Sequence, residues 1–218
     1  MALALEDYGS AAAWNQGVTV SITVPSNSNC YLVVMLQYTN GFQSIKYAGV
    51  DFPTVESYIV AGIINCRMCG IIPTSGTNDL VIVDTGGNGE QGHLIWALFT
   101  GVSQVKPIGA KTSNSSSGSI TTDITTTFNN SITLEGQFLY PDAYTLDVVQ
   151  DSSQTEIGQI ISSPRGLASA IKSQPTAGTQ TLAYHITRLY PASIYTTDAI
   201  WEIVDANEVS GGSFLPFL

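Results

Sequence analysis

The sequence predicts an all-β protein: a two-sheet, jelly-roll-like β-sandwich with an internal pseudo-twofold repeat of about 100 residues. Three observations support this prediction. Apolar and polar residues alternate with period two along much of the chain, Gly, Pro, Asn and Ser separate these runs, and the two halves of the chain share one order of motifs. Only 11% of the 218 residues are charged, against about 25% in an ordinary domain.

The alternation predicts most of the strands. Residues 18–24 alternate Val or Ile with Thr or Ser, as in a strand with one buried and one wet face. Residues 30–38 are continuously apolar, which is typical of a central strand. Further strands are expected near 44–48, 55–63, 79–84, 92–101, 119–126, 131–139, 144–150, 155–161, 167–173, 179–187 and 196–205. Their regular spacing, with turn residues between them, is typical of a sandwich or barrel.

An internal repeat relates two halves, residues 17–102 and 118–206. Residues 73–80 (PTSGTNDL) return 102 positions later as residues 175–182 (PTAGTQTL). Three further matches keep the same order: residues 29–32 with 130–133, Gly17 with Gly118, and the strand around Trp96 with the strand around Trp201. The order and the nearly constant offset indicate two halves with the same succession of strands.

Two arrangements accommodate this repeat. Tandem immunoglobulin-like domains would need a linker, which residues 103–118 can provide. Alternatively, the halves interleave into one sandwich over residues 17–206, and 103–118 crosses its end. We favour the single sandwich, because a half by itself would leave apolar faces and sheet edges open. Residues 1–16 are then an N-terminal arm and residues 207–218 an apolar C-terminal arm.

The charge balance excludes several classes of protein. Seven Lys and Arg against seventeen Asp and Glu give a net charge of −10. The cations are too few to form a nucleic-acid-binding patch, and the apolar content is too high for intrinsic disorder. No apolar run is long enough to span a membrane. Residues 1–8 lack the basic and apolar regions of a signal peptide, so we expect none.

Residues 87–92 (GNGEQG) match the GxGxxG pattern of dinucleotide-binding loops and follow a predicted strand. Such a loop must open a helix whose N-terminus faces the pyrophosphate. Residues 93–99 are strand-like instead, and Glu90 would place a carboxylate among the phosphates. A glycine-rich hairpin loop is therefore the better interpretation, and we expect no cofactor.

Cys66 and Cys69 have the spacing of a metal knuckle. A structural zinc site needs four ligands, and the chain otherwise offers only Cys30, His93 and His185, each far from the others in sequence. We therefore expect no metal site and interpret the cysteines as buried thiols. An intermolecular disulfide is the alternative, because three cysteines cannot all pair within one chain.

Catalytic patterns are not found in the sequence. It has no GxSxG elbow and no HExxH motif, and both histidines lie within predicted strands. Asp142, Asp147 and Asp151 form a loose acidic group without the spacing of an EF-hand loop. We therefore expect no catalytic residues and no enzyme.

A set of turn and strand motifs resembles a known β-sandwich domain. The motifs are Leu32-Val-Val34, Tyr47-Ala-Gly-Val50, Pro73-Thr-Ser-Gly-Thr77, Leu98-Phe-Thr-Gly-Val102 and Lys106-Pro-Ile-Gly109. Domains similar to this one occur in phage virion structural proteins and in large prokaryotic surface proteins, and the resemblance covers most of residues 17–205. It implies a fold and a setting, and it carries over no functional residue.

We therefore expect a virion structural protein: a capsid decoration, fibre or tail-associated protein that assembles with copies of itself and with other virion proteins. The candidate assembly contacts are apolar residues of the C-terminal arm, which would dock on a neighbouring subunit. They are Phe214, Leu215, Phe217 and Leu218. One alternative is a carbohydrate-binding module or lectin, with a glycan stacked on aromatic side chains. The other is an extracellular filament subunit whose arm completes a neighbour's sheet.

Overall fold

The computed structural model describes residues 2–14, 17–26, 28–38, 42–60, 64–84, 92–141, 146–162, 165–188 and 194–209. These residues form 17 β-strands and one short helix, α1 (Ala206–Val209), so the all-β sandwich prediction is confirmed. The N-terminal half contains β1 (Ala4–Trp14), β2 (Gly17–Val24), β3 (Tyr31–Tyr38), β4 (Phe42–Tyr47), β5 (Val50–Asp51), β6 (Thr54–Val60), β7 (Ile64–Ile71), β8 (Gly76–Asp84) and β9 (Gly92–Thr100). The C-terminal half contains β10 (Ile108–Ser117), β11 (Ile120–Thr126), β12 (Ser131–Pro141), β13 (Leu146–Gln150), β14 (Thr155–Ser162), β15 (Arg165–Gln174), β16 (Gly178–Arg188) and β17 (Ile194–Ile203).

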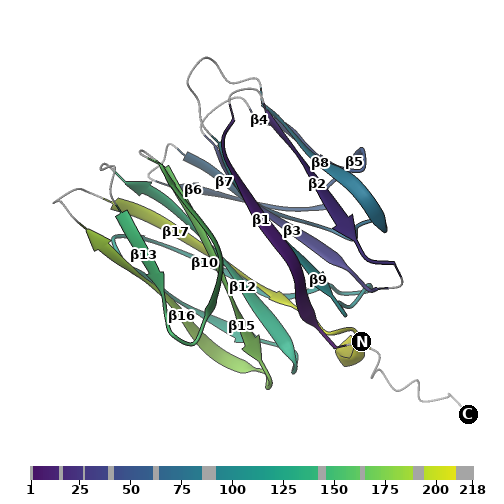
Figure 1. The fold of residues 1–218 in the computed structure, drawn as a ribbon. Helices are drawn as coiled ribbons and strands as arrows, with labels where there is room; N and C mark the ends of the chain where they lie inside the picture. Colours follow the sequence, from purple (N-terminus) through teal and green to yellow (C-terminus); the bar gives the residue numbers. More distant parts are fainter. Residues whose placement is uncertain are drawn as a thin grey trace, which may run out of the picture.

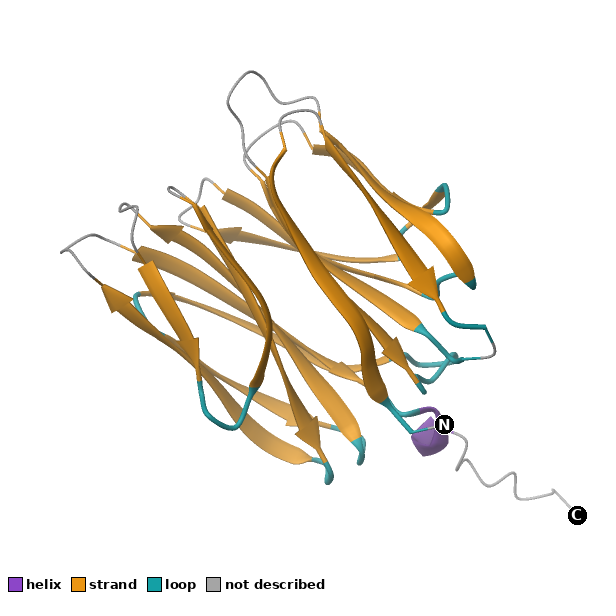
Figure 2. Ribbon diagram, viewed as in Figure 1, coloured by secondary structure: helices purple, strands orange, loops and turns teal. Residues whose placement is uncertain are grey.

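The strands form four antiparallel sheets that stack as layers (Figures 1 and 2). In the N-terminal half, a five-stranded sheet of order β1-β9-β3-β7-β6 packs on a sheet of order β2-β8-β4-β5. In the C-terminal half, a five-stranded sheet of order β10-β17-β12-β15-β14 packs on a sheet of order β11-β16-β13. The two five-stranded sheets face each other at the centre. Among the described strands, none of one half enters a sheet of the other, so the halves stack as two sandwiches and do not interleave.

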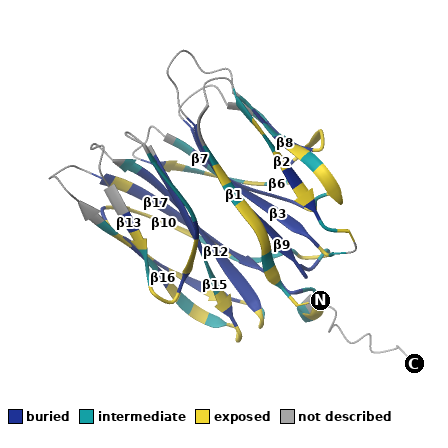
Figure 3. Cartoon of the chain, viewed as in Figure 1, coloured by how far each residue is buried: buried dark blue, intermediate teal, exposed yellow. Residues whose placement is uncertain are grey.

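The reason for the extra layers is that the central strands are apolar on both faces. Every residue of β3 and of β9 is buried. A strand of this kind needs a covering sheet on each side, which a two-layer sandwich cannot provide. The burial pattern accordingly runs from deeply buried central sheets to more exposed outer ones (Figure 3).

Three cores hold the layers together. The central core lies between the two five-stranded sheets and contains large side chains from both halves, including Met35, Phe99, Phe138 and Trp201. The N-half core lies between the two sheets of the N-terminal half and is apolar. The C-half core lies between the two sheets of the C-terminal half, and its apolar clusters are smaller.

The two halves have the same strand order. The series β1, β9, β3, β7, β6 corresponds to β10, β17, β12, β15, β14, and β2, β8, β4 corresponds to β11, β16, β13. Ser21 Oγ donates to Asp79 Oδ1 at 2.7 Å across β2 and β8. At the corresponding register of β11 and β16, Thr181 Oγ1 donates to Asp123 Oδ1 at 2.6 Å, with hydroxyl and carboxylate exchanged between the strands.

The alignment of Trp96 with Trp201 is wrong by one residue. Trp96 pairs with Val34 and faces the N-half core, whereas Trp201 pairs with Leu134 and faces the central core. Successive side chains of a strand point to opposite faces, so a slip of one residue moves a side chain into a different core.

Two segments expected to lie outside the sheets are edge strands. Residues 4–14, within the predicted N-terminal arm, form β1 and pair with β9. Residues 108–117, within the predicted linker or crossing segment, form β10 and pair with β17. Both segments are rich in Ala or Ser. These two strands bury few large side chains, and their sequences show no apolar alternation. Of the C-terminal arm, only residues 207–209 are described, within α1.

Candidate functional site

Two of the features predicted from sequence lie largely outside the described residues. The first is the set of candidate assembly contacts in the C-terminal arm, Phe214, Leu215, Phe217 and Leu218. The second is the glycine motif, of which residues 87–91 are not described. Gly92 opens β9, and the residues after it form the expected strand. The chain therefore does not continue from the motif into the helix that a dinucleotide site requires.

The cysteines are buried and point in different directions. Cys66 and Cys69 both lie on β7, three residues apart, so Cys66 faces the central core and Cys69 the N-half core. Burial raises the pKa of Cys66 well above its usual value and that of Cys69 to about 12. Cys30 is also buried, and none of the three cysteines forms a disulfide with another. Cys66 and Cys69 therefore cannot hold one metal together, and all three thiols are covered by the fold.

The most unusual chemistry lies in the C-half core, where Glu135 of β12 and Asp198 of β17 are fully buried. Their carboxyl groups interact with each other, and the side chain of Gln154 donates from Nε2 to Glu135 Oε2. Thr122 of β11, in the opposite sheet, lies near the Asp198 carboxyl, but neither Asp198 oxygen has a hydrogen-bond partner among the described residues. Gln137, also fully buried, is the cross-strand neighbour of Asp198. The two acids thus meet inside a polar cluster between the sheets.

Burial controls the protonation of this pair. It raises the pKa of Asp198 from 3.8 to about 6. Burial and, after it, the charge of Asp198 raise the pKa of Glu135 well above its usual 4.5. Two buried carboxylates without a cation cannot both ionise cheaply. The pair therefore keeps a proton at pH values where exposed carboxylates have lost theirs.

A third buried acid, Glu202 of β17, joins two segments of the chain through hydrogen bonds, and we call this arrangement the clamp. The Glu202 carboxylate accepts hydrogen bonds from the backbone nitrogens of Ala110 at 2.7 Å, Thr127 at 3.0 Å and Phe128 at 2.9 Å, and from the Thr127 hydroxyl at 2.9 Å. Burial raises the pKa of Glu202, but these hydrogen bonds outweigh it and leave the pKa below its usual value. Gly109 makes room, because a Cβ there would lie 2.2 Å from Glu202 Oε2. The clamp ties β10 to the turn that follows β11.

Sequence reasoning missed these acids because they look like scattered surface charges. The feature that could have identified them is their position relative to the other half of the chain. Leu36 pairs with Leu94 in the N-terminal half, and at the equivalent place Gln137 pairs with Asp198. Val34 corresponds in the same way to Glu135. Extending the repeat along each strand would have placed these polar residues at core positions.

Exposed apolar side chains surround a second feature, which we call the base pocket. This cavity of about 270 Å³ is lined by Tyr31, Val50, Asp51, Pro53, Thr54, Ile71, Ile72 and Pro107. Val50 and Ile72 remain 56% and 46% exposed. Val204 N donates to Pro107 O at 3.0 Å, so the pocket lies at the end of the molecule where the chain leaves β17.

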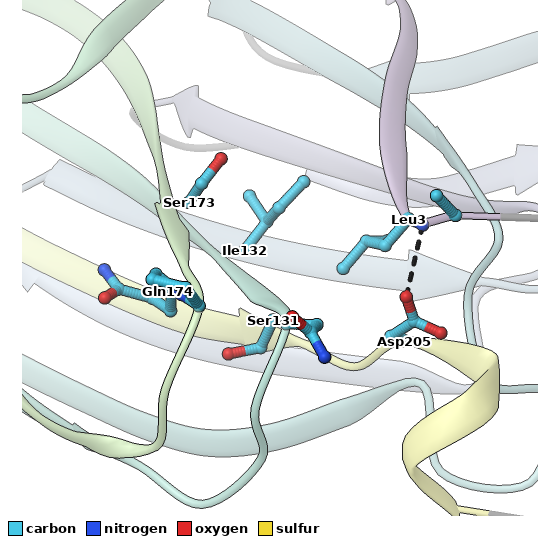
Figure 4. A pocket seen from close by; sticks show the side chains of 9 residues that line it. Leu3, Ser131, Ile132, Ser173, Gln174 and Asp205 are labelled. Carbon is cyan, nitrogen blue, oxygen red and sulfur yellow. Dashed lines mark hydrogen bonds between the residues drawn. The ribbon is translucent and has the colours of Figure 1, made fainter.

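A larger cavity of about 410 Å³ lies at the same end and is more polar (Figure 4). Its lining includes Ser131, Gln174 and Asp205, and Leu3 N donates to Asp205 Oδ2 at 3.3 Å across it. Asn130, on its rim, donates from Nδ2 to Glu208 Oε1 at 3.0 Å. This cavity therefore borders the last described turn of the chain.

No group of three or more His, Cys, Asp and Glu side chains in the described ranges is placed to hold a metal ion. None of the helical residues described there forms a helix long and apolar enough to cross a membrane. Comparison with protein-family models, curated proteins and solved structures gives no match. The function is therefore judged from the chemistry and geometry of this chain's own residues.

Proposed function

We propose that this chain is a structural protein of a virus particle that acts through assembly with copies of itself and with other particle proteins, without catalysis. The observation that carries the proposal is that the folded surface exposes apolar side chains at two adjoining places, which meet at Thr54. One is the base pocket, with Val50 and Ile72, and the other is edge strand β6, with Val55 and Ile59. Two different contact surfaces let a chain assemble beyond a closed dimer. The resemblance to virion domains supports the setting.

In this proposal the C-terminal arm of one copy binds the base pocket of the next. The arm ends in Phe-Leu-Pro-Phe-Leu, and the pocket offers Pro53, Ile71, Ile72 and Pro107. The described chain ends at Val209, at the same end of the molecule as the pocket. The nine residues that follow span at most about 30 Å when extended. That reach is sufficient for a neighbouring copy, and the match is apolar on both sides.

The test is assembly of the full chain against a variant with Phe214, Leu215, Phe217 and Leu218 changed to Ser. Light scattering and electron microscopy should show species larger than a dimer for the wild type and their loss in the variant. Ile72→Asp, in the pocket, should have the same effect. Val149→Ser is the matched control, because Val149 is 45% exposed but lies on neither surface. Unchanged assembly in the arm variant would contradict the proposal.

A further inference from the structure

Strand β6 differs from the other edges of the two central sheets. These sheets have four edges, β1, β6, β10 and β14. The pairing of β1, β10 and β14 with their neighbours is interrupted by register shifts, whereas β6 pairs with β7 from Thr54 to Val60 without interruption. Bulges are a common device that stops an edge from pairing with another chain. Of the described central edges, β6 alone lacks this protection.

The outward side chains of β6 are suited to contact. Val55 is 41% exposed, Ile59 is 59% exposed, and Ser57 between them is also exposed. The one charged residue of the strand, Glu56, is bound to Lys111 Nζ of β10. This edge therefore carries no net charge, although the whole chain has a net charge of −10. Two copies can approach here without the repulsion expected elsewhere.

The end of β6 is held in place by the other half of the molecule. Thr197 Oγ1 of β17 donates to the backbone oxygen of Ile59 at 3.2 Å. Tyr58, on the opposite face of the strand, packs against the central core and lies 6.1 Å from the ring of Phe138. A strand anchored in this way is already ordered, so pairing costs little conformational entropy.

We propose that β6 pairs antiparallel with β6 of a second copy about a twofold axis at Ser57, so that two five-stranded sheets become one continuous sheet. This inference deepens the assembly proposed above and uses the edge of β6, which adjoins the base pocket at Thr54. The sequence TVESYIV is self-complementary around its central Ser57. In that register Val55 meets the second copy's Ile59, and Glu56 meets the second copy's Tyr58. Apolar side chains thus meet apolar ones, and the two glutamates do not face each other.

The sharpest test is Ser57→Cys. Directly opposite residues of an antiparallel pair have Cα atoms about 4.5–5.5 Å apart, within the range that a disulfide spans. The native thiols are buried, so the new thiol is the accessible one. We expect S57C to oxidise to a reducible product of twice the 23.1 kDa chain mass. Ser10→Cys, at an exposed position on the opposite edge strand of the same sheet, is the control and should give no covalent dimer.

A second measurement keeps the test independent of thiol chemistry. Ile59→Lys places a charge on the edge and should lower the dimer fraction at least tenfold in sedimentation experiments, with an unchanged thermal midpoint. Val149→Lys should leave the dimer unchanged. Equal cross-linking of S57C and S10C, or an unaltered dimer in I59K, would overturn the pairing. A cross-linked product of another mass would place a different chain on the edge and would overturn it too.

The two proposals fail in distinguishable ways. If S57C cross-links but the wild type forms nothing larger than a dimer, the pairing of β6 stands and the particle function does not. If large species form and depend on the C-terminal arm while S57C does not cross-link, the particle function stands and the pairing of β6 does not.

Discussion

The two halves of the molecule share a strand order but fill their cores differently. The N-half core consists of apolar side chains from Ile22 to Leu98. The C-half core, at corresponding positions, contains Glu135, Gln137 and Asp198, all fully buried. The contrast shows that the same strand order can enclose an apolar core or a core with buried polar side chains. An apolar core needs only close packing, whereas this polar core buries groups that lack a hydrogen-bond partner among the described residues, including both Asp198 oxygens and the Gln137 amide.

This difference has a consequence for stability. An apolar core is insensitive to pH, because it contains no group that titrates near neutrality. A core with buried acids is coupled to pH through every carboxyl whose pKa differs between the folded and unfolded states. Glu135 and Asp198 therefore couple the stability of the C-half core to pH, and the N-half core has no such pair.

The largest expected effect on stability comes from a substitution that places in the N-half core the glutamate found at the equivalent position of the C-half core. Val34→Glu would bury a carboxyl between Cys69 and Trp96, without the Gln154 amide that Glu135 has. We expect a loss of about 5 kcal/mol or failure to fold, measured by chemical denaturation. Thr19→Glu, on the exposed face of β2, is the control. A V34E protein within about 1 kcal/mol of the wild type would show that the two cores are interchangeable.

The next effect concerns the clamp. Glu202→Leu introduces the residue that the N-terminal half has at the equivalent place, Leu98, and leaves the N–H groups of Ala110, Thr127 and Phe128 without their acceptor. These donors are only partly buried, so each lost hydrogen bond costs about 1 kcal/mol and we expect a loss of about 3 kcal/mol. Since the pKa of Glu202 is lowered by folding, its contribution is present above its usual pKa of 4.5 and is lost as the pH falls. An unchanged thermal midpoint in E202L, with Glu156→Leu as the exposed control, would argue against the clamp.

The buried pair of Glu135 and Asp198 should make stability depend on pH in the opposite direction to Glu202. Asp198 has a folded pKa of about 6 against 3.8 unfolded, so stability is fully present below 3.8 and falls by about 3 kcal/mol as the pH rises past 6. Glu135, whose pKa is raised too, extends the loss to higher pH. Hydrogen exchange, corrected for its intrinsic rate, should show β12 and β17 opening more readily at pH 8 than at pH 4. β2 and β8, whose buried side chains are all apolar, should not change.

The matched variant E135Q/D198N removes both titrating groups and keeps their shapes. Its C-terminal half should no longer open more readily at pH 8 than at pH 4. A wild-type C-terminal half that is equally protected at pH 4 and pH 8 would contradict the assignment of raised pKa values to this pair.

The smallest expected effect on stability tests whether the outer sheets of the two halves are equivalent. Ser21→Ala and Thr181→Ala each remove one of the matching hydroxyl–carboxylate hydrogen bonds on the outer sheets. Both pairs are exposed, so each variant should lose only about 0.5 kcal/mol. Thermal denaturation should place the two variants together. A clear difference between them would show that the halves differ in their surfaces as well as in their cores.

The strand positions predicted from sequence are correct where burial produces a pattern of apolar residues. The strand expected at residues 131–139 is part of β12, and that expected at 119–126 is β11 within one residue. The prediction failed for β1 and β10, equivalent edge strands whose Ala- and Ser-rich sequences bury little and show no alternation. It also missed the acidic pair, because a single sequence does not distinguish a buried carboxylate from a solvated one.

The sequence by itself determined that the chain is all-β, where most strands and turns lie, and that the halves share an order of motifs. Only the tertiary structure decided how many sheets there are and which core each side chain enters. The physical reason is that a strand's period of two defines two faces and says nothing about what covers them. Trp96 and Trp201 illustrate this, since one residue of register sends them to different cores.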